Sequence, residues 1–213
     1  MFRELFTKKF QIPERTEHEI KGLCSILFID DNDFRVVDIL KTSGWQNTKL
    51  MNDIESLDQK DIRDAHILFV DIQGVGKKLG FKDEGLGIIT ALKSKYPNKK
   101  VVVYSAESTG NRFHRGLSVA DERLSKNADP YEFQVIVEKY SKELFSKVEL
   151  INRIKNQLRR EYGIQIDSKT IENNLIKIKK RKLHSSLEIG KIFNIQNAAA
   201  LATIIKIFFG SGE

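Results

Sequence analysis

The sequence predicts a doubly wound α/β fold with a five-stranded parallel sheet, followed by a smaller all-α domain. Two short apolar runs, Ile26–Ile29 and Ile67–Val70, are continuous rather than alternating, which is typical of strands covered by helices on both faces. Amphipathic stretches separate the strand-like runs, and this alternation of strand and helix favours a parallel sheet. After residue 140 the chain becomes basic and mainly helical in pattern, which indicates a second domain.

The elements follow one another in a regular order. Apolar, β-branched runs predict strands at residues 25–30, 48–51, 67–71 and 100–105, with a short fifth strand at 123–125. Apolar residues at steps of three and four predict helices over residues 34–41 and 86–92. Asp129 as a cap and Pro130 in the first turn start a further helix, whose apolar stripe predicts that it continues to Arg160.

Composition excludes several classes of protein. The single cysteine, Cys24, rules out a disulfide scaffold and any metal site built from several cysteines. The chain has no uninterrupted run of about 18 apolar residues, so we expect no membrane span. Its first residues also lack the apolar core of a signal peptide. We therefore expect a cytoplasmic location.

The distribution of charge indicates how the chain divides. Residues 1–140 hold 22 Lys and Arg against 22 Asp and Glu, whereas residues 141–213 hold 14 against 7, so the net charge of +7 lies in the last third. We expect an N-terminal extension over residues 1–21, the α/β domain over residues 22–140 and a basic helical domain over residues 141–213. Such a basic domain can bind nucleic acid or an acidic partner, or can be a solvated helical surface.

Polar side chains follow the apolar strands at the edge of the sheet where ligands collect in parallel α/β folds. Asp30 and Asp31 end the first strand, Asp71 ends the third, Ser105 ends the fourth, and Lys126 follows the fifth. A carboxylate directly after four apolar strand residues is costly to bury unless a cation or hydrogen bonds satisfy it. Three carboxylates at neighbouring strand ends therefore predict a site for a hard divalent cation, and Mg²⁺ fits oxygen ligands.

This order of acidic, hydroxyl and basic residues resembles the receiver domain of response regulators in two-component signalling. The resemblance extends over about residues 22–140 and implies a flavodoxin-like receiver fold. It also implies that Asp71 accepts a phosphoryl group from a partner histidine kinase, with Lys126 paired to Asp71 and Ser105 donating a hydrogen bond to the phosphoryl group. Such a protein catalyses its own phosphorylation but is not a turnover enzyme.

The same resemblance implies a set of metal ligands. Asp31 and Asp71 would hold Mg²⁺ together with the backbone carbonyl of Gln73. Asp30 would position a metal-bound water or contact the metal itself. The cation would offset the repulsion between the attacking carboxylate and the anionic phosphoryl group.

Three features depart from the family pattern. The loop after Asp71 is longer than usual and rich in glycine, so we expect it to be mobile. Asn127 stands where the family has a proline. Arg123 stands where the family commonly has an aromatic residue that turns inward on activation, and Tyr104 or Phe113 is a candidate to replace it.

The C-terminal third contains a capped basic helix over residues 167–183, which is similar to the recognition-helix stretch of the four-helix DNA-binding domain of many response regulators. That similarity implies base contacts and phosphate contacts to double-stranded DNA. The candidates for bases are Lys169, Asn173 and Asn174, and those for phosphates are Lys177, Lys180 and Arg181.

The apolar tail supports a second interpretation of the C-terminal domain. Its apolar residues need a surface to bury against, and they are Leu201, Ile204, Ile205, Phe208 and Phe209. A helical module for homo-oligomerisation or partner docking explains them without DNA. The sequence thus predicts a phosphorylation-controlled regulator whose output is DNA binding. The alternative is a receiver-like interaction module that binds no DNA. In either case we expect a homo-oligomer formed through the receiver or the C-terminal helices.

Overall fold

The computed structural model describes residues 14–106 and 118–209. These residues fall into two compact units, Thr16–Glu143 and the chain from Leu144 onward, with Glu14 and Arg15 grouped with the second unit. The first unit therefore includes six residues, 16–21, that the sequence assigns to an N-terminal extension. They matter to the fold because Thr16 caps helix α1, Glu17–Leu23, through a capping box with Glu19.

The first unit is built on a parallel sheet. Its strands are β1 (Ile26–Ile29), β2 (Thr48–Met51), β3 (Ile67–Asp71), β4 (Lys100–Ser105) and β5 (Glu122–Ser125). They are all parallel and lie in the order β2-β1-β3-β4-β5. This is the doubly wound, flavodoxin-like order, so the predicted fold class and the predicted strands are confirmed.

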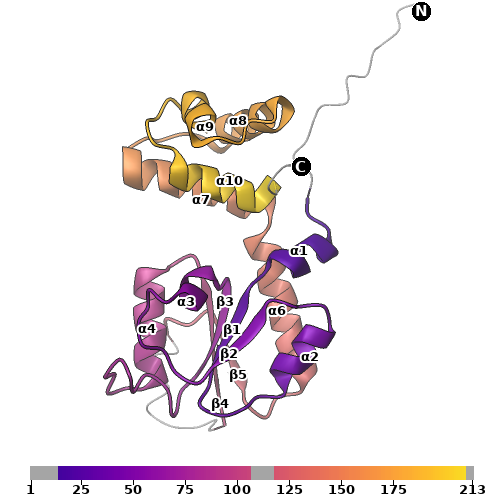
Figure 1. Ribbon diagram of the computed structural model, residues 1–213, viewed down its shortest axis with the longest axis vertical. Coiled ribbons are helices and arrows are strands. Elements are labelled where there is room, and N and C mark those ends of the chain that lie inside the picture. Colours follow the sequence, from indigo (N-terminus) through magenta and orange to yellow (C-terminus); the bar gives the residue numbers. More distant parts are fainter. Residues whose placement is uncertain (1–13, 107–117, 210–213) are drawn as a thin grey trace, which may run out of the picture. The chain divides into compact units, whose positions relative to one another are not determined.

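Helices cover both faces of this sheet, as Figure 1 shows. The helices after α1 are α2 (Val36–Thr42), α3 (Lys60–Asp64), α4 (Gly85–Lys95) and α6 (Pro130–Leu144). Because strand side chains alternate, β1, β3 and β4 present aliphatic residues to α3 and α4 on one face. On the other face lies an aromatic cluster with neighbouring centroids 4.5–6.4 Å apart, made of the buried rings of Phe28, Phe69, Tyr104 and Phe133 and the half-buried ring of Phe34.

The predicted single helix from Pro130 to Arg160 is wrong. Helix α6 ends at Leu144, and a new helix, α7, spans Lys147–Tyr162. The Ser146 side chain accepts a hydrogen bond from the Glu149 backbone N–H, which satisfies a free donor of the first turn of α7. The apolar stripe continues through the break because both helices bury one face. A prediction based on that stripe alone therefore joins the two helices into one.

The second unit consists of α7, α8 (Ser168–Arg181), α9 (Ser186–Phe193) and α10 (Ala199–Phe209). Helix α7 packs against α8 and α10, and α9 packs against the same two helices. Their buried residues form a separate core, which includes Ile154, Leu175 and Leu201. Since this unit has its own core, it is a domain in the physical sense.

The apolar tail packs largely into the core of this second unit. Leu201 and Ile205 are buried in its core, and Ile204 and Phe209 are partly buried against that core. The side chain of Phe208 lies outside the described residues. The tail therefore needs no partner molecule to bury its main apolar positions. In the part of the chain that the structure describes, the helices are too short or too polar to cross a bilayer.

Candidate functional site

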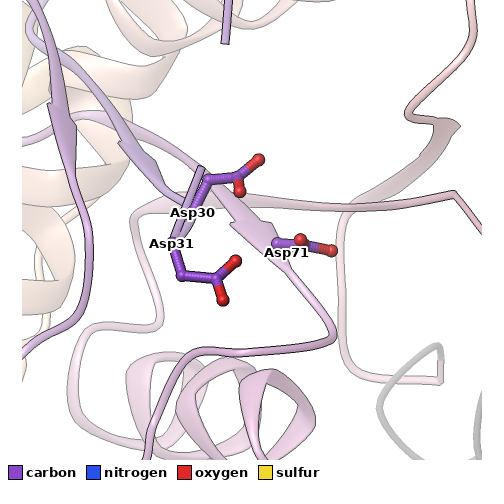
Figure 2. Close-up of side chains that lie close together, drawn as sticks. All are labelled: Asp30, Asp31 and Asp71. Carbon is purple, nitrogen blue, oxygen red and sulfur yellow. The ribbon is translucent and has the colours of Figure 1, made fainter. Parts of the chain in front are cut away.

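Three carboxylates meet at the carboxyl edge of the sheet. Asp30 and Asp31 follow β1, and Asp71 is the last residue of the neighbouring strand β3. Figure 2 shows the three side chains gathered at this edge. One oxygen from each lies within 4.8 Å of the others. The convergence follows from the pairing of β1 with β3, which sets the two strand ends side by side.

Lys126 connects two of these carboxylates. Its Nζ lies 2.8 Å from Asp71 Oδ2 and 2.8 Å from Asp30 Oδ2. The Lys126 backbone N–H donates to the Ser105 carbonyl at 2.8 Å, so the end of β4 fixes the residue that follows β5. Ser105 itself is buried, and it pairs in register with Ser125 of β5.

Asp30 is fully buried and receives hydrogen bonds from several donors of the protein. Tyr104 Oη donates to Asp30 Oδ2 at 2.8 Å, and the Asn32 backbone N–H donates to Asp30 Oδ1 at 2.9 Å. Lys126 contacts both oxygens. These bonds offset the cost of burying the charge, and they direct Asp30 toward Lys126 and the aromatic cluster.

Burial and neighbouring charges shift the pKa values of Asp71 and Lys126. Burial raises the pKa of Asp71 above its ordinary value, the hydrogen bond and charge of Lys126 oppose this, and the Asp30 charge raises it further. For Lys126, burial alone lowers the pKa, but the hydrogen bonds to Asp30 and Asp71 outweigh burial and raise it. Lys126 therefore stays protonated, and its ammonium faces the carboxylates of Asp30 and Asp71.

The donor set fits a hard divalent cation. Asp31 is exposed, and Asp71 has a second oxygen, Oδ1, that Lys126 does not contact and that accepts only a backbone hydrogen bond from Ile72 among the contacts described; both residues offer the carboxylate ligands that Mg²⁺ prefers. The Asp31 carboxylate lies against the backbone of Gly74, where a methyl group would come within 2.1 Å of Asp31 Oδ2. Gly74 also has a φ of +81°, which favours glycine. A larger residue there would displace one of the candidate ligands.

Several hydrogen bonds hold the glycine-rich loop after Asp71, residues 72–84, which the sequence predicts to be mobile. Asp53, which follows β2, accepts hydrogen bonds from the backbone N–H groups of Gly76 at 2.6 Å and Lys78 at 3.1 Å. Glu84, at the far end of the loop, accepts from the Gly74 N–H at 3.0 Å. The sequence did not reveal these two acids, because Asp53 does not directly follow an apolar strand as Asp71 does, and Glu84 meets the loop only through its folding.

The remaining predicted residues of this site are placed as follows. Gln73 is exposed in the loop directly after β3, next to Gly74. Arg123 is exposed on β5, so its side chain does not occupy the interior position expected of an aromatic switch residue. Tyr104, one of the two candidates to replace it, is buried and bonded to Asp30. The other candidate, Phe113, lies outside the described residues.

The candidate DNA-contacting residues lie on α8, and five of the six are exposed. These five are Lys169, Asn173, Lys177, Lys180 and Arg181. Asn174 is the exception, because it is only 8% exposed and lies among the buried residues of the helix. The helical period places residue 174 beside Ile171, Leu175 and Ile178, so we remove it from the set of residues able to reach a base.

Comparisons with known proteins returned similar folds only. No family model matches the chain, and no curated protein matches it. Several solved structures are similar, among them receiver domains and response regulators, as the sequence predicted. One is the beryllofluoride-activated DrrB receiver domain, with 17% identity, 55% of this chain and 97% of that chain covered, and a TM-score of 0.45.

Two further solved structures extend this comparison. The receiver domain of NtrX from Brucella abortus has 24% identity, covers 55% of this chain and 98% of that chain, and gives a TM-score of 0.46. A response regulator from Burkholderia pseudomallei, with a phosphorylated aspartic acid, calcium ion and citrate, has 14% identity. That match covers 84% of this chain and 97% of that chain, with a TM-score of 0.43.

Proposed function

We propose that this chain is a phosphorylation-controlled response regulator that accepts a phosphoryl group on Asp71 from a partner histidine kinase. The observation that carries this proposal is the position of Lys126, which bridges Asp71 and Asp30 at 2.8 Å while Asp31 lies in the same cluster. A lysine placed in this way pairs with the carboxylate before transfer and with a phosphoryl oxygen after it. The protein does not turn over a substrate in this scheme.

The proposed reaction forms one bond and breaks another. An oxygen of the Asp71 carboxylate attacks the phosphorus of a phosphohistidine and forms an acyl phosphate. The bond from phosphorus to the imidazole nitrogen breaks, and the histidine leaves with the electron pair of that bond and takes up a proton. Asp71 Oδ1 accepts a hydrogen bond from the Ile72 backbone N–H at 2.7 Å, and this bond limits rotation of the nucleophile.

Asp31 and Asp71, with the Gln73 carbonyl, would hold Mg²⁺, and Asp30 would position a metal-bound water or contact the cation. When bound, Mg²⁺ supplies positive charge that offsets repulsion between the carboxylate and the phosphoryl oxygens. Lys126 supplies a second positive charge, and Ser105 supplies a hydroxyl donor at the end of β4. Most of the catalytic effect expected of such a site is positioning and charge stabilisation.

Beryllofluoride binding tests this proposal because beryllofluoride mimics a phosphoryl group on a carboxylate. The wild-type chain should bind it only when Mg²⁺ is present, as measured by calorimetry or by ¹⁹F NMR. Asp71→Ala should not bind it. Equal responses from the two chains would remove the phosphoacceptor role of Asp71.

We propose DNA binding as the output, supported by the exposed residues of α8. Lys169, Asn173 and Lys177 follow one another at steps of four and so share one face of the helix, with Lys180 and Arg181 continuing it. The alternative output is docking to a protein or to a second copy of the chain. A gel-shift titration at several salt concentrations separates the two.

A DNA-binding output predicts that affinity falls steeply with salt, because each neutralised phosphate releases counterions. Lys177→Gln with Lys180→Gln should weaken the complex and reduce the salt slope by about 2. Glu161→Gln, an exposed change on α7, is the control and should not weaken binding. Absence of any complex at low salt would favour protein docking.

A further inference from the structure

We infer that Glu84 is a positioning residue for the proposed Mg²⁺ site, acting through the peptide bond between Gln73 and Gly74. This inference rests on the proposed function, since the site is the one described above. Glu84 does not contact the three carboxylates of the cluster as a fourth ligand. It acts at the backbone of the loop that would supply the Gln73 carbonyl.

The loop over residues 72–84 closes on the strand from which it starts. The Gly85 N–H donates to the Ile72 carbonyl at 3.0 Å, so the two ends of the loop meet. A methyl group at Gly85 would come within 1.8 Å of the Asp71 carbonyl oxygen, which shows how tightly the end of the loop packs on the nucleophile's backbone. The residue just before this contact, Glu84, therefore has little freedom of backbone position.

Glu84 adopts an uncommon backbone conformation at this closure. Its φ is 49° and its ψ is −128°, a combination that an L-residue with a side chain rarely adopts. The neighbouring turns use Gly74, Gly76 and Gly80 for their positive φ angles. Glycine would relieve the strain at position 84 as well, yet the chain carries a glutamate whose side chain reaches back across the loop.

The side chain of Glu84 fixes one peptide group of the loop. Glu84 Oε2 accepts the hydrogen bond from the Gly74 N–H at 3.0 Å. In a trans peptide the N–H and C=O point in opposite directions, and no described peptide bond is cis. The direction of the Gly74 N–H thus sets the direction of the Gln73 carbonyl, which is the backbone ligand expected of the Mg²⁺ site.

The same peptide adjoins a candidate side-chain ligand. The Asp31 carboxylate lies against Gly74, so rotation of the Gln73–Gly74 peptide would also disturb Asp31. Groups that orient metal ligands without touching the metal commonly change metal affinity by about 10-fold to 100-fold when they are removed. Glu84 is placed to orient one backbone ligand and to preserve the position of one carboxylate.

Mg²⁺ titrations of three variants test the inference. Glu84→Gly relieves the positive φ and removes the acceptor, so its resistance to urea without metal should be unchanged or higher while Mg²⁺ affinity falls about 10-fold. Glu84→Gln keeps an acceptor oxygen for the Gly74 N–H and should recover most of the lost affinity. Glu55→Gln is the matched control, because Glu55 also pairs with this loop, through Lys78, but at the exposed surface.

The outcomes are distinct. Wild-type affinity in Glu84→Gly would overturn the inference, and so would equal losses in Glu84→Gly and Glu84→Gln, because charge rather than peptide orientation would then be responsible. A loss of stability in Glu84→Gly that matches its loss of affinity would indicate a merely structural role and would also overturn it. Failure of the wild type to bind Mg²⁺ would reject the proposed function together with the inference, whereas the other outcomes leave the proposed function standing.

Discussion

The three carboxylates of the site differ in their burial and in their hydrogen-bond partners. Asp30 is buried and accepts hydrogen bonds from Tyr104, Asn32 and Lys126, whereas Asp31 is exposed; Asp71 is also buried, at 4% exposed. The sequence could place all three at one edge, because apolar strands that end in aspartate are a local pattern. It could not assign Tyr104 to Asp30, since that bond joins residues 74 positions apart.

Tyr104→Phe tests the role of the buried hydroxyl. The substitution keeps the ring in the aromatic cluster and removes one hydrogen bond to a buried charge, so it should reduce the free energy of unfolding by about 2 kcal/mol. It should also weaken beryllofluoride binding, because Asp30 and its partner Lys126 lose a fixed position. Urea unfolding and calorimetry measure the two effects.

Tyr140→Phe provides the control, since Tyr140 Oη donates to the Asp121 carbonyl at 2.8 Å, away from the acidic cluster. It should lose stability by about 1 kcal/mol and bind beryllofluoride as the wild type does. If Tyr104→Phe behaves in the same way as Tyr140→Phe in both measurements, Tyr104 has no special role in the site.

The Asp53 carboxylate should make the free energy of unfolding depend on pH in the acidic range. Its partial burial by itself raises the pKa, but hydrogen bonds from the backbone N–H groups of Gly76, Lys78 and Ile54 outweigh burial and lower the pKa below its ordinary value. A lowered pKa in the folded state gives stability that is present above the unfolded-state value of about 3.9 and is lost as pH falls through the folded-state pKa.

The variant Asp53→Ala should therefore be less stable than the wild type by about 2 kcal/mol at pH 7, and the difference should shrink below about pH 4. Urea unfolding of both chains at several pH values provides the measurement. A difference that stays constant between neutral and strongly acidic pH would show that the Asp53 carboxylate does not hold the loop as a charged group.

At the scale of elements, the strands and most helices were predictable because their signals are local. Continuous apolar runs identified β1, β3 and β4, and the Asp129-Pro130 pair identified the start of α6. The break between α6 and α7 and the closure of the loop over residues 72–84 were not predicted. Both depend on hydrogen bonds and on contacts with other elements, which a pattern of hydrophobicity does not contain.

Two glycine-to-alanine substitutions, one expected to lower stability and one to raise it, test how closely α4 packs against β3. Gly85→Ala places a methyl group 1.8 Å from the Asp71 carbonyl oxygen, and backbone must move to relieve this overlap. We expect a loss of stability of about 3 kcal/mol or more, from the range for overpacked sites. Thermal or urea unfolding is the measurement.

Gly22→Ala is the matched substitution in α1. Gly22 lies in a helix, and an added methyl group would meet no atom within 4 Å. It should raise stability by about 0.5–1 kcal/mol, because alanine loses less conformational freedom in a helix than glycine does. A Gly85→Ala protein as stable as Gly22→Ala would contradict the close contact between α4 and β3.

At the scale of the whole molecule, the chain contains two units with separate cores, and the net positive charge lies in the helical unit. The proposed relay requires that phosphorylation in one unit changes the free energy of states in the other. Beryllofluoride with Mg²⁺ should therefore change amide hydrogen exchange within residues 144–209 of the wild type. The same addition to Asp71→Ala should change nothing, and an unchanged wild-type helical unit would contradict the relay.

Locating the phosphoryl group on the chain tests the account most directly. The wild type is incubated with Mg²⁺ and acetyl phosphate, the acyl phosphate is reduced with borohydride, and the modified peptide is identified by mass spectrometry. We expect a single modified position, residue 71, and no modification without Mg²⁺. A folded wild-type chain that stays unmodified, or one modified at another aspartate while residue 71 is untouched, would contradict the account.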